Sequence, residues 1–255
     1  GVEVRGTVSE RAKTVRVGLQ PAIGSPQAIA AMALDAATRG AKVLILRNTV
    51  RDCIATQKAV ENLAREEGLD ELLLTCNGSA SPHHARYARE HREALDRAIE
   101  AAVGKERPSG GRVVVATQTV QQSLDLDSDL LLTDLCPIDI LLQRIGRLHR
   151  HERLRPAGFE EARTLVLVPS RRDLEHLIRK HGSASGGHGF GTVYPDLRIL
   201  EATWRSIEQK PVWTIPEDNR FLVEFATHPE NLAHAPSPLI ISFDHQKGLT
   251  NGFKL

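Results

Sequence analysis

The residues best suited to chemistry lie in one basic stretch, from Gln143 to Arg150. If a helix covers residues 138–149, then Gln143, Arg147 and Arg150 fall at positions i, i+4 and i+7, within one narrow stripe. The apolar residues between them fall on the opposite side, where they can pack against a sheet. Fixed guanidinium groups bind phosphate oxygens and stabilise the charge that develops in phosphoryl transfer. The spacing therefore predicts arginine fingers for a nucleotide held by another domain, and a solvated helix face paired with acids is the alternative.

The bulk composition is that of an ordinary globular protein. The 255 residues are 41% hydrophobic and 25% charged, and the net charge is only +1, so any nucleic-acid surface must be local. The three cysteines form no C-x-x-C pair, which argues against a disulfide framework or a cysteine zinc site and favours a cytoplasmic location. No apolar stretch reaches the roughly 20 residues that a membrane span needs, so we expect no membrane partner.

Short apolar runs alternate with helical patterns along most of the chain. The predicted buried strands cover residues 43–46, 72–74, 113–116, 130–132 and 165–168. The predicted helices cover residues 26–39, 51–67, 88–103 and 138–149. This alternation predicts an α/β fold with a doubly wound, mostly parallel sheet and helices on both faces. Ligands of such sheets gather at the carboxyl ends of the strands.

The pattern changes after residue 168. Residues 182–191 contain five glycines and predict a flexible loop. Residues 196–209 and 216–226 predict helices, whereas residues 236–255 give no clear pattern and stay undetermined. We therefore expect a first unit over residues 1–185 and a small, mainly helical extension over residues 186–255.

Several segments resemble a known family. The string Q-R-x-G-R-x-x-R that begins at Gln143 resembles motif VI of superfamily 2 helicases, and residues 113–134 resemble their motif V. The wording A-T-Q-x-V-x-Q-S-L-D-L-D, followed by P-I-D-x-L-L-Q-R-x-G-R-L-H-R-H, is similar to the CRISPR-associated helicase–nuclease of type I systems. Residues 45–50 resemble its motif IV, and residues 194–204 and 215–220 resemble its segments beyond the second lobe. The resemblance implies a second RecA-like lobe.

The resemblance also implies a role for each candidate residue. Arg147 and Arg150 would be arginine fingers that face the γ-phosphate of ATP. The residues expected to support the nucleotide site or its motif are Gln143, Arg144, Gly146 and Asp125. The residues expected to contact the backbone of single-stranded DNA, without reading its sequence, are Thr117, Gln118, Asn48 and Thr49. The alternatives are that Thr117 only ends a strand and that Asp125 only caps a turn.

Three motifs of a complete motor and nuclease are absent from this sequence. It has no phosphate loop G-x-x-x-x-G-K-[ST], because Gly104-Lys105 is followed by Glu106, and no D-E-x-[HD] box. Residues 130–134 resemble a Walker B strand but predict a core strand that ends in a turn residue. No adjacent His-Asp pair matches the nuclease half, and we expect no metal on this chain.

We therefore expect an excised piece of an ATP-dependent DNA helicase of CRISPR antiviral defence. ATP and Mg²⁺ would lie between this lobe and a first RecA-like lobe, so this piece alone would neither hydrolyse ATP nor unwind DNA. The implied partners are single-stranded DNA, the first lobe, a nuclease domain and the CRISPR target-recognition complex. The alternatives are a non-catalytic RecA-like binding module, such as a natural split subunit, and a lobe of another superfamily 2 helicase. A Rossmann-type enzyme is disfavoured because G-x-G-x-x-G is missing.

Overall fold

The computed structural model describes residues 12–121, 124–172, 174–178 and 187–233. The loop predicted at residues 182–191 therefore lies partly outside the described residues, and the undetermined segment 236–255 lies wholly outside them. Among the residues that the structure describes, no helix is long and apolar enough to cross a membrane.

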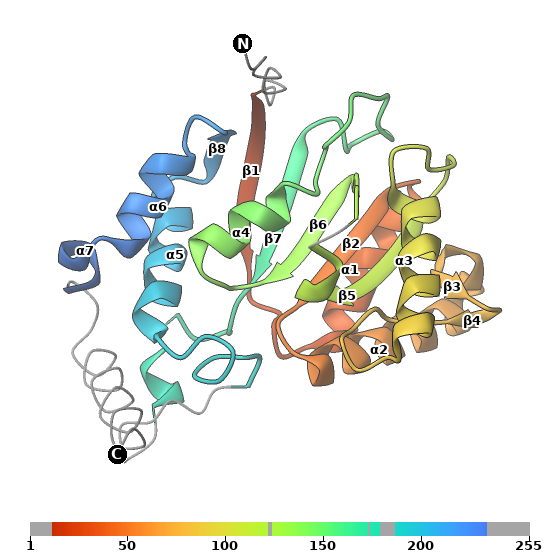
Figure 1. Cartoon of the computed structure of the whole chain (residues 1–255), viewed down its shortest axis with the longest axis horizontal. Helices are drawn as coiled ribbons and strands as arrows, with labels where there is room; N and C mark the ends of the chain where they lie inside the picture. The colour runs from red at the N-terminus through yellow and green to blue at the C-terminus, as the bar shows by residue number, and fades with distance from the viewer. Residues whose placement is uncertain (1–11, 122–123, 173, 179–186, 234–255) are drawn as a thin grey trace, which may run out of the picture.

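A six-stranded sheet in the order β5-β2-β6-β7-β1-β8 forms the centre of the molecule (Figure 1). The strands are β1 (Lys13–Gln20), β2 (Lys42–Arg47), β5 (Arg112–Thr117), β6 (Leu130–Asp134), β7 (Ala162–Leu167) and β8 (Val212–Ile215), with a separate small hairpin of β3 (Thr75–Cys76) and β4 (Ser79–Ala80). Every pairing within the large sheet is parallel except that of β1 with β8. The predicted mostly parallel α/β sheet is confirmed.

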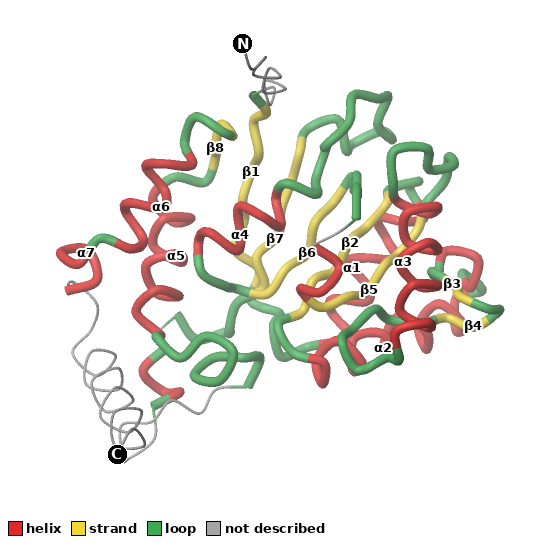
Figure 2. Tube along the Cα trace, viewed as in Figure 1, coloured by secondary structure: helices red, strands yellow, loops and turns green. Residues whose placement is uncertain are grey.

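Helices cover both faces of this sheet. They are α1 (Pro26–Thr38), α2 (Val50–Glu67), α3 (Arg89–Val103), α4 (Ile138–Ile145), α5 (Leu197–Gln209), α6 (Asn219–Thr227) and α7 (Pro229–Ala233). In Figure 1, α1 lies behind the sheet and α4 lies in front of it. Figure 2 shows α5, α6 and α7 gathered beside the edge formed by β1 and β8.

The ends of the first helices follow the capping residues in the sequence. The Ser25 hydroxyl accepts a hydrogen bond from the N–H of Ala28, and a proline occupies the first helical position of α1. Thr49 caps α2 in the same way, and α2 ends at Gly68, which has a left-handed φ of 69°. These predicted boundaries are confirmed to within a residue.

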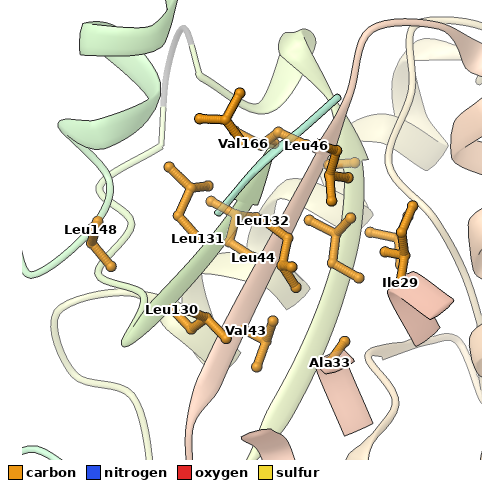
Figure 3. Close-up of a cluster of buried hydrophobic side chains, with 14 of the residues drawn as sticks. Ile29, Ala33, Val43, Leu44, Leu46, Leu130, Leu131, Leu132, Leu148 and Val166 are labelled. Carbon is orange, nitrogen blue, oxygen red and sulfur yellow. The ribbon is translucent and has the colours of Figure 1, made fainter. Parts of the chain in front are cut away.

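The core lies between the central strands and the helices. All residues of β2 and β6 are buried, as expected for strands covered on both faces. Figure 3 shows side chains from β2 and β6 packed together with Ile29 and Ala33 of α1 and with Val166 of β7. This packing fixes the strand ends, which carry the candidate site.

Three predicted elements differ from the structure. The strand predicted at residues 72–74 does not form. Residues 70–72 form a single 3₁₀ turn, and Leu73 pairs with Val113 only through an isolated bridge. The strand β1 was not predicted, because only Val15 and Val17 of its eight residues are fully buried and polar residues alternate with them. The helix predicted from residue 216 begins instead at Asn219, because β8 takes up residues 212–215.

The segment after the glycine-rich loop is joined to the sheet. Strand β8 pairs with β1 over residues Lys13 to Arg16, and the Trp213 ring in β8 is completely buried. The helix predicted at residues 196–209 is confirmed as α5, whose first turn is capped by the Asp196 side chain. The described part of the extension, residues 187–233, is therefore mainly helical and also supplies one edge strand.

Candidate functional site

The predicted site residues fall into two groups at opposite ends of the parallel strands. Asn48 and Thr49 follow the carboxyl end of β2, and Thr117 and Gln118 stand at the carboxyl end of β5. Arg147 and Arg150 instead lie near the amino end of β6. The Arg147 carbonyl accepts hydrogen bonds from Ser128, which comes two residues before that strand. Strand β6 has five residues, so its two ends are roughly 13 Å apart.

A buried ion pair closes the carboxyl end of the central strands. The Arg47 Nε atom lies 2.9 Å from Asp134 Oδ1, and both side chains are inaccessible to solvent. The main-chain N–H of Asn48 also donates to Asp134 Oδ2, at 2.8 Å. Burial raises the pKa of the Asp134 carboxyl, and the adjacent Arg47 opposes that rise. Asp134 was predicted to be a turn residue, and this is wrong, since it ends β6 and neutralises a buried arginine.

Arg144 connects α4 to the same network. Its guanidinium donates to Thr133 Oγ1 at 2.7 Å, to Asn48 Oδ1 at 3.0 Å and to the Tyr194 hydroxyl at 3.3 Å. The Arg144 side chain is completely buried. In this structure Arg144 therefore holds α4 against the strand ends. It supports the position of the Q-R-x-G-R-x-x-R segment.

The side chain of Asn48 is also consumed by internal contacts. Its amide donates to the carbonyls of Leu135 and His188, at 2.9 and 3.0 Å, and only 2% of the residue is exposed. In this structure the Asn48 side chain has no group left for a phosphate. Its role is to tie the end of β2 to the loop that carries His188.

Thr49 and its neighbours show how that loop is attached. The Thr49 hydroxyl caps α2 and donates to Asp52 Oδ2 at 2.7 Å. His188 Nδ1 lies 3.3 Å from the same Asp52 oxygen. Burial alone would raise the pKa of Asp52, but hydrogen bonds from His188 and Thr49 outweigh it and lower the pKa to about 2. No sequence pattern indicates this contact, because 136 residues separate Asp52 from His188.

Thr117 and Gln118 differ in how exposed their polar groups are. Thr117 is buried, and its Oγ1 lies 3.1 Å from Thr119 Oγ1. Thr119 in turn lies 3.2 Å from His83 Nδ1, and His83 Nε2 lies 2.7 Å from Asp96 Oδ1. The half-buried Gln118 has an amide oxygen without a hydrogen-bond partner in the described part of the chain. Of these residues, Gln118 is the one whose side chain makes no hydrogen bond among the described residues, and because its oxygen is buried, its amide nitrogen is the group that can donate to a phosphate.

The arginines do not lie on one helix, so the predicted stripe is wrong. Helix α4 ends at Ile145 with Gly146 as its C-cap, and Arg147 and Arg150 lie in the turn that follows. Contacts from distant residues end the helix early. The Lys13 ammonium donates to the carbonyls of Ile145 and Leu148, which a longer helix would use itself. His149 adopts a left-handed φ of 46°, which a helix cannot contain.

The turn nevertheless brings together the predicted nucleotide-site residues. Arg147 Nη1 donates to the carbonyl of Leu124 at 2.7 Å, and Arg150 Nε lies 2.7 Å from Asp125 Oδ1. The Arg150 side chain remains 43% exposed. Burial and the neighbouring positive charge of Arg150 lower the pKa of Arg147. Gln143 is exposed on the last turn of α4, beside Gly146. Two adjacent cations, one of them accessible, can together bind an anion.

Residues missed by the sequence analysis hold the other side of this turn. Asp127 Oδ1 accepts the main-chain N–H groups of Arg150 and His151, at 2.8 and 3.3 Å. His151 Nε2 also lies 2.9 Å from Asp125 Oδ2. The turn is therefore pinned by carboxylates on both sides, and the second aspartate of the string L-D-L-D was the available signal. In the described part of the chain, no group of three or more His, Cys, Asp or Glu side chains could hold a metal ion.

Titration of His149, which lies in this turn, should make the free energy of unfolding vary with pH. Burial, followed by repulsion from Arg155, lowers the pKa of His149 from 6.5 to about 4. Between these values the unfolded chain binds a proton that the folded chain does not bind, so this contribution to stability is present above pH 6.5 and is lost as the pH falls to about 4. After allowance for partial exposure, we expect a loss on the order of 2 kcal/mol.

The variant His149→Asn should remove this part of the pH dependence. Asparagine tolerates the left-handed backbone but does not titrate. Urea unfolding at pH 7 and at pH 4 measures the effect, and the difference between the two pH values should shrink in the variant. His91→Asn, on the exposed side of α3, is the control and should retain the wild-type difference. Equal differences in all three proteins would contradict the assignment.

Comparison with known proteins finds sequences similar to part of this chain. Residues 39–153 match the family model described as the C-terminal part of the CRISPR-associated nuclease/helicase Cas3. The CRISPR-associated endonuclease/helicase Cas3 of Thermus thermophilus is 40% identical over 157 residues, which are 61% of this chain and 16% of that protein. The Cas3 of Escherichia coli is 38% identical over 131 residues, 49% of this chain and 13% of that protein. The chain thus spans less than a fifth of these relatives.

Solved structures show the same fold. T. fusca Cas3 superposes with a TM-score of 0.75 and 25% identity, over 98% of this chain and 27% of that chain. The structure described as T. fusca Cas3-ATP gives 0.73 and 25%, over 97% and 27%. A chain from a structure described as a CRISPR RNA-guided surveillance complex, pre-nicking, gives 0.65 and 26%, over 96% and 29%. These matches extend beyond the family model, through the helices after the glycine-rich loop.

Proposed function

We propose that this chain completes the nucleotide site of an ATP-dependent motor on single-stranded DNA, because residues 39–153 match the model of the Cas3 C-terminal part and the fold is similar to that of a solved Cas3 structure. The observation that carries the proposal is the turn after α4. It directs the guanidinium groups of Arg147 and Arg150 to two consecutive residues, Leu124 and Asp125, at the end of a helix that is anchored in the sheet. The motor would act in CRISPR defence, with a nuclease domain in the same protein.

The arginines would act on ATP held by a first RecA-like lobe. ATP supplies the phosphoryl group, and the first lobe would hold its phosphates and Mg²⁺, because this chain has no phosphate loop. Arg150 is accessible, so closure of the two lobes could bring it to the γ-phosphate. Asp125 holds its guanidinium until then and Arg144 holds the helix that precedes it. Both are positioning residues, and Arg147 and Arg150 are the catalytic ones.

Binding of single-stranded DNA belongs to the opposite end of the strands. There Gln118 offers an uncharged side-chain amide, which suits a motor that must release phosphates in every cycle, and Thr49 and Thr117 hold the strand ends through hydrogen bonds within the chain. Asn48 would organise this edge from within through its buried contacts. Separate nucleotide and DNA edges on one rigid sheet would let lobe closure couple hydrolysis to a change of grip on DNA.

The variant Gln118→Ala tests the DNA edge. In a protein that joins this chain to a first RecA-like lobe, we expect the affinity for single-stranded DNA to fall about tenfold, the effect of losing one hydrogen bond to a charged group. Because glutamine is uncharged, the salt dependence of binding should not change. Fluorescence anisotropy at several salt concentrations measures both quantities. The exposed residue Gln27 in α1 provides the control, Gln27→Ala, and equal affinity of both variants would remove Gln118 from the site.

The surveillance complex is the proposed partner in the cell. This chain superposes over nearly all of its length on a chain from a structure described as a CRISPR RNA-guided surveillance complex, pre-nicking. We extend that association to the protein that contains this chain. Loss of co-elution with a purified surveillance complex on target DNA would count against it.

A further inference from the structure

A cationic pocket opens at the amino end of the sheet, beyond the turn after α4 that contains Arg147 and Arg150. Its volume is about 360 Å³, and it is lined by residues from the starts of β2 and β6, from the loop before β5 and from the loop before β7. The charged residues of the lining are Lys42, Arg107, Asp129, Arg153 and Arg155. Neither Arg147 nor Arg150 belongs to the lining, so the pocket is distinct from the proposed nucleotide contacts.

The three arginines are held rigidly by two buried carboxylates. Arg107 and Arg155 lie 2.6 and 2.9 Å from Asp129 Oδ1. Arg153 and Arg155 lie 2.6 and 2.8 Å from the carboxylate of Asp127. The side chains of both aspartates and of Arg107 and Arg155 are at most 5% exposed. These guanidinium groups are thus fixed before any ligand arrives, which lowers the entropy cost of binding.

The positive charges outnumber the negative ones. Counting Lys42 with the three arginines gives four cations against Asp127 and Asp129, a local charge of +2. A single bound dianion would bring this sum to zero. A buried excess of charge is costly unless a counterion compensates it.

Lys42 is the cation of this lining that makes no ion pair with a carboxylate of the described residues, although the negative charge of Asp129 partly offsets its charge. Only 2% of the residue is exposed, and the contact that it makes to Asp129 uses its main-chain N–H, at 2.8 Å. Its ammonium has no hydrogen-bond partner among the described residues. Burial, followed by repulsion from Arg112 and Arg107, lowers the pKa of Lys42 to about 8. A structural salt-bridge cluster would not require a buried lysine facing an open cavity.

We propose that this pocket binds a tetrahedral dianion of the phosphate class, with Lys42 as the direct ligand and Arg107 and Arg155 as fixed neighbours. The Lys42 ammonium provides hydrogen-bond donors to the anion. The arginines are already paired with carboxylates and contribute positive electrostatic potential. The anion is either free phosphate or the terminal phosphomonoester of a nucleic acid, because an internal phosphodiester carries only one negative charge. The inference rests on the pocket alone and holds whether or not Arg147 and Arg150 are arginine fingers.

Isothermal titration of the chain with sulfate and with inorganic phosphate tests the proposal. Sulfate keeps its charge between pH 7 and 9, so a loss of affinity over this range reports deprotonation of Lys42 and not of the probe. We expect saturable binding with one site, a loss of at least about tenfold in the variant Lys42→Met, and no loss in Lys105→Met. Lys105 is exposed near the rim but does not line the pocket, so it matches the charge change.

A second titration separates the two sources of phosphate. A 5′-phosphorylated oligothymidylate of about 12 nucleotides is added to the wild type and to Lys42→Met, with and without saturating sulfate. Competition by sulfate together with weaker binding by Lys42→Met assigns the pocket to a nucleic-acid phosphate. If neither sulfate nor the substitution Lys42→Met changes the affinity for the oligonucleotide, the pocket is assigned to free phosphate. The absence of saturable sulfate and phosphate binding in the wild type, or equal binding by Lys42→Met and Lys105→Met, would overturn the proposal.

Discussion

Replacing Arg150 by alanine should lower kcat for ATP hydrolysis about 1000-fold, in a protein that joins this chain to a first RecA-like lobe and in the presence of single-stranded DNA. The reason is that a guanidinium stabilises charge that builds up only in the transition state, so its loss lowers kcat and leaves ATP binding nearly unchanged. Arg147→Ala should have an effect of similar size. Steady-state hydrolysis and equilibrium binding of ATP measure the two quantities separately.

The control for these variants is Arg89→Ala. Arg89 lies in α3, its side chain is 84% exposed, and it pairs only with Glu93 in the same helix. It removes the same charge and should leave kcat unchanged. If Arg147→Ala and Arg150→Ala also hydrolyse ATP normally, the turn after α4 has only a structural role. The chain would then be better described as a RecA-like binding module.

Removal of Arg47 should have the largest effect on stability. Arg47→Met leaves the carboxylate of Asp134 buried without its partner, and breaking such a pair costs about 3–5 kcal/mol of unfolding free energy. The Arg47 guanidinium also donates to Thr56 Oγ1 and to the carbonyl of Ile23, which lose these contacts. Urea unfolding at pH 7 measures the loss. The loss should shrink at lower pH, because protonation of Asp134 removes the uncompensated charge.

A surface ion pair provides the control for this prediction. Arg16 lies 3.7 Å from Glu161, with the two side chains 57% and 75% exposed, so Arg16→Met should change stability by less than about 1 kcal/mol. The double variant Arg47→Met, Asp134→Leu removes both buried charges and should recover part of the lost stability. A single variant Arg47→Met that loses no more than Arg16→Met would show that the buried pair does not hold the strand ends together.

The sequence predicted the elements whose burial is complete. Strands β2, β5 and β6 are covered on both faces, so their residues are apolar throughout and visible as short runs. Strand β1 lies beside the edge strand β8, and polar residues at Thr14 and Arg16 interrupt its pattern. Prediction from composition therefore failed where a strand meets solvent.

Contacts between distant residues decided what the sequence could not show. The periodicity of α4 continues past Ile145, but the Lys13 ammonium, 132 residues away, takes the carbonyl that the next turn would need. Asn48 was placed correctly at the end of β2, but its burial depends on Arg144 and on His188, which are 96 and 140 residues away. The candidate arginines were identified by the order of residues in a motif, and their actual geometry comes from tertiary contacts.

The affinity for a transition-state mimic tests the central claim most directly. ADP with tetrafluoroaluminate imitates the transferring phosphoryl group, so a site completed by arginine fingers should bind it at least about 100-fold more tightly than a non-hydrolysable ATP analogue. We predict that Arg150→Ala loses this preference and keeps its affinity for the analogue. An Arg150→Ala protein that still prefers the mimic as strongly as the wild type would contradict the assignment of this lobe as the catalytic partner.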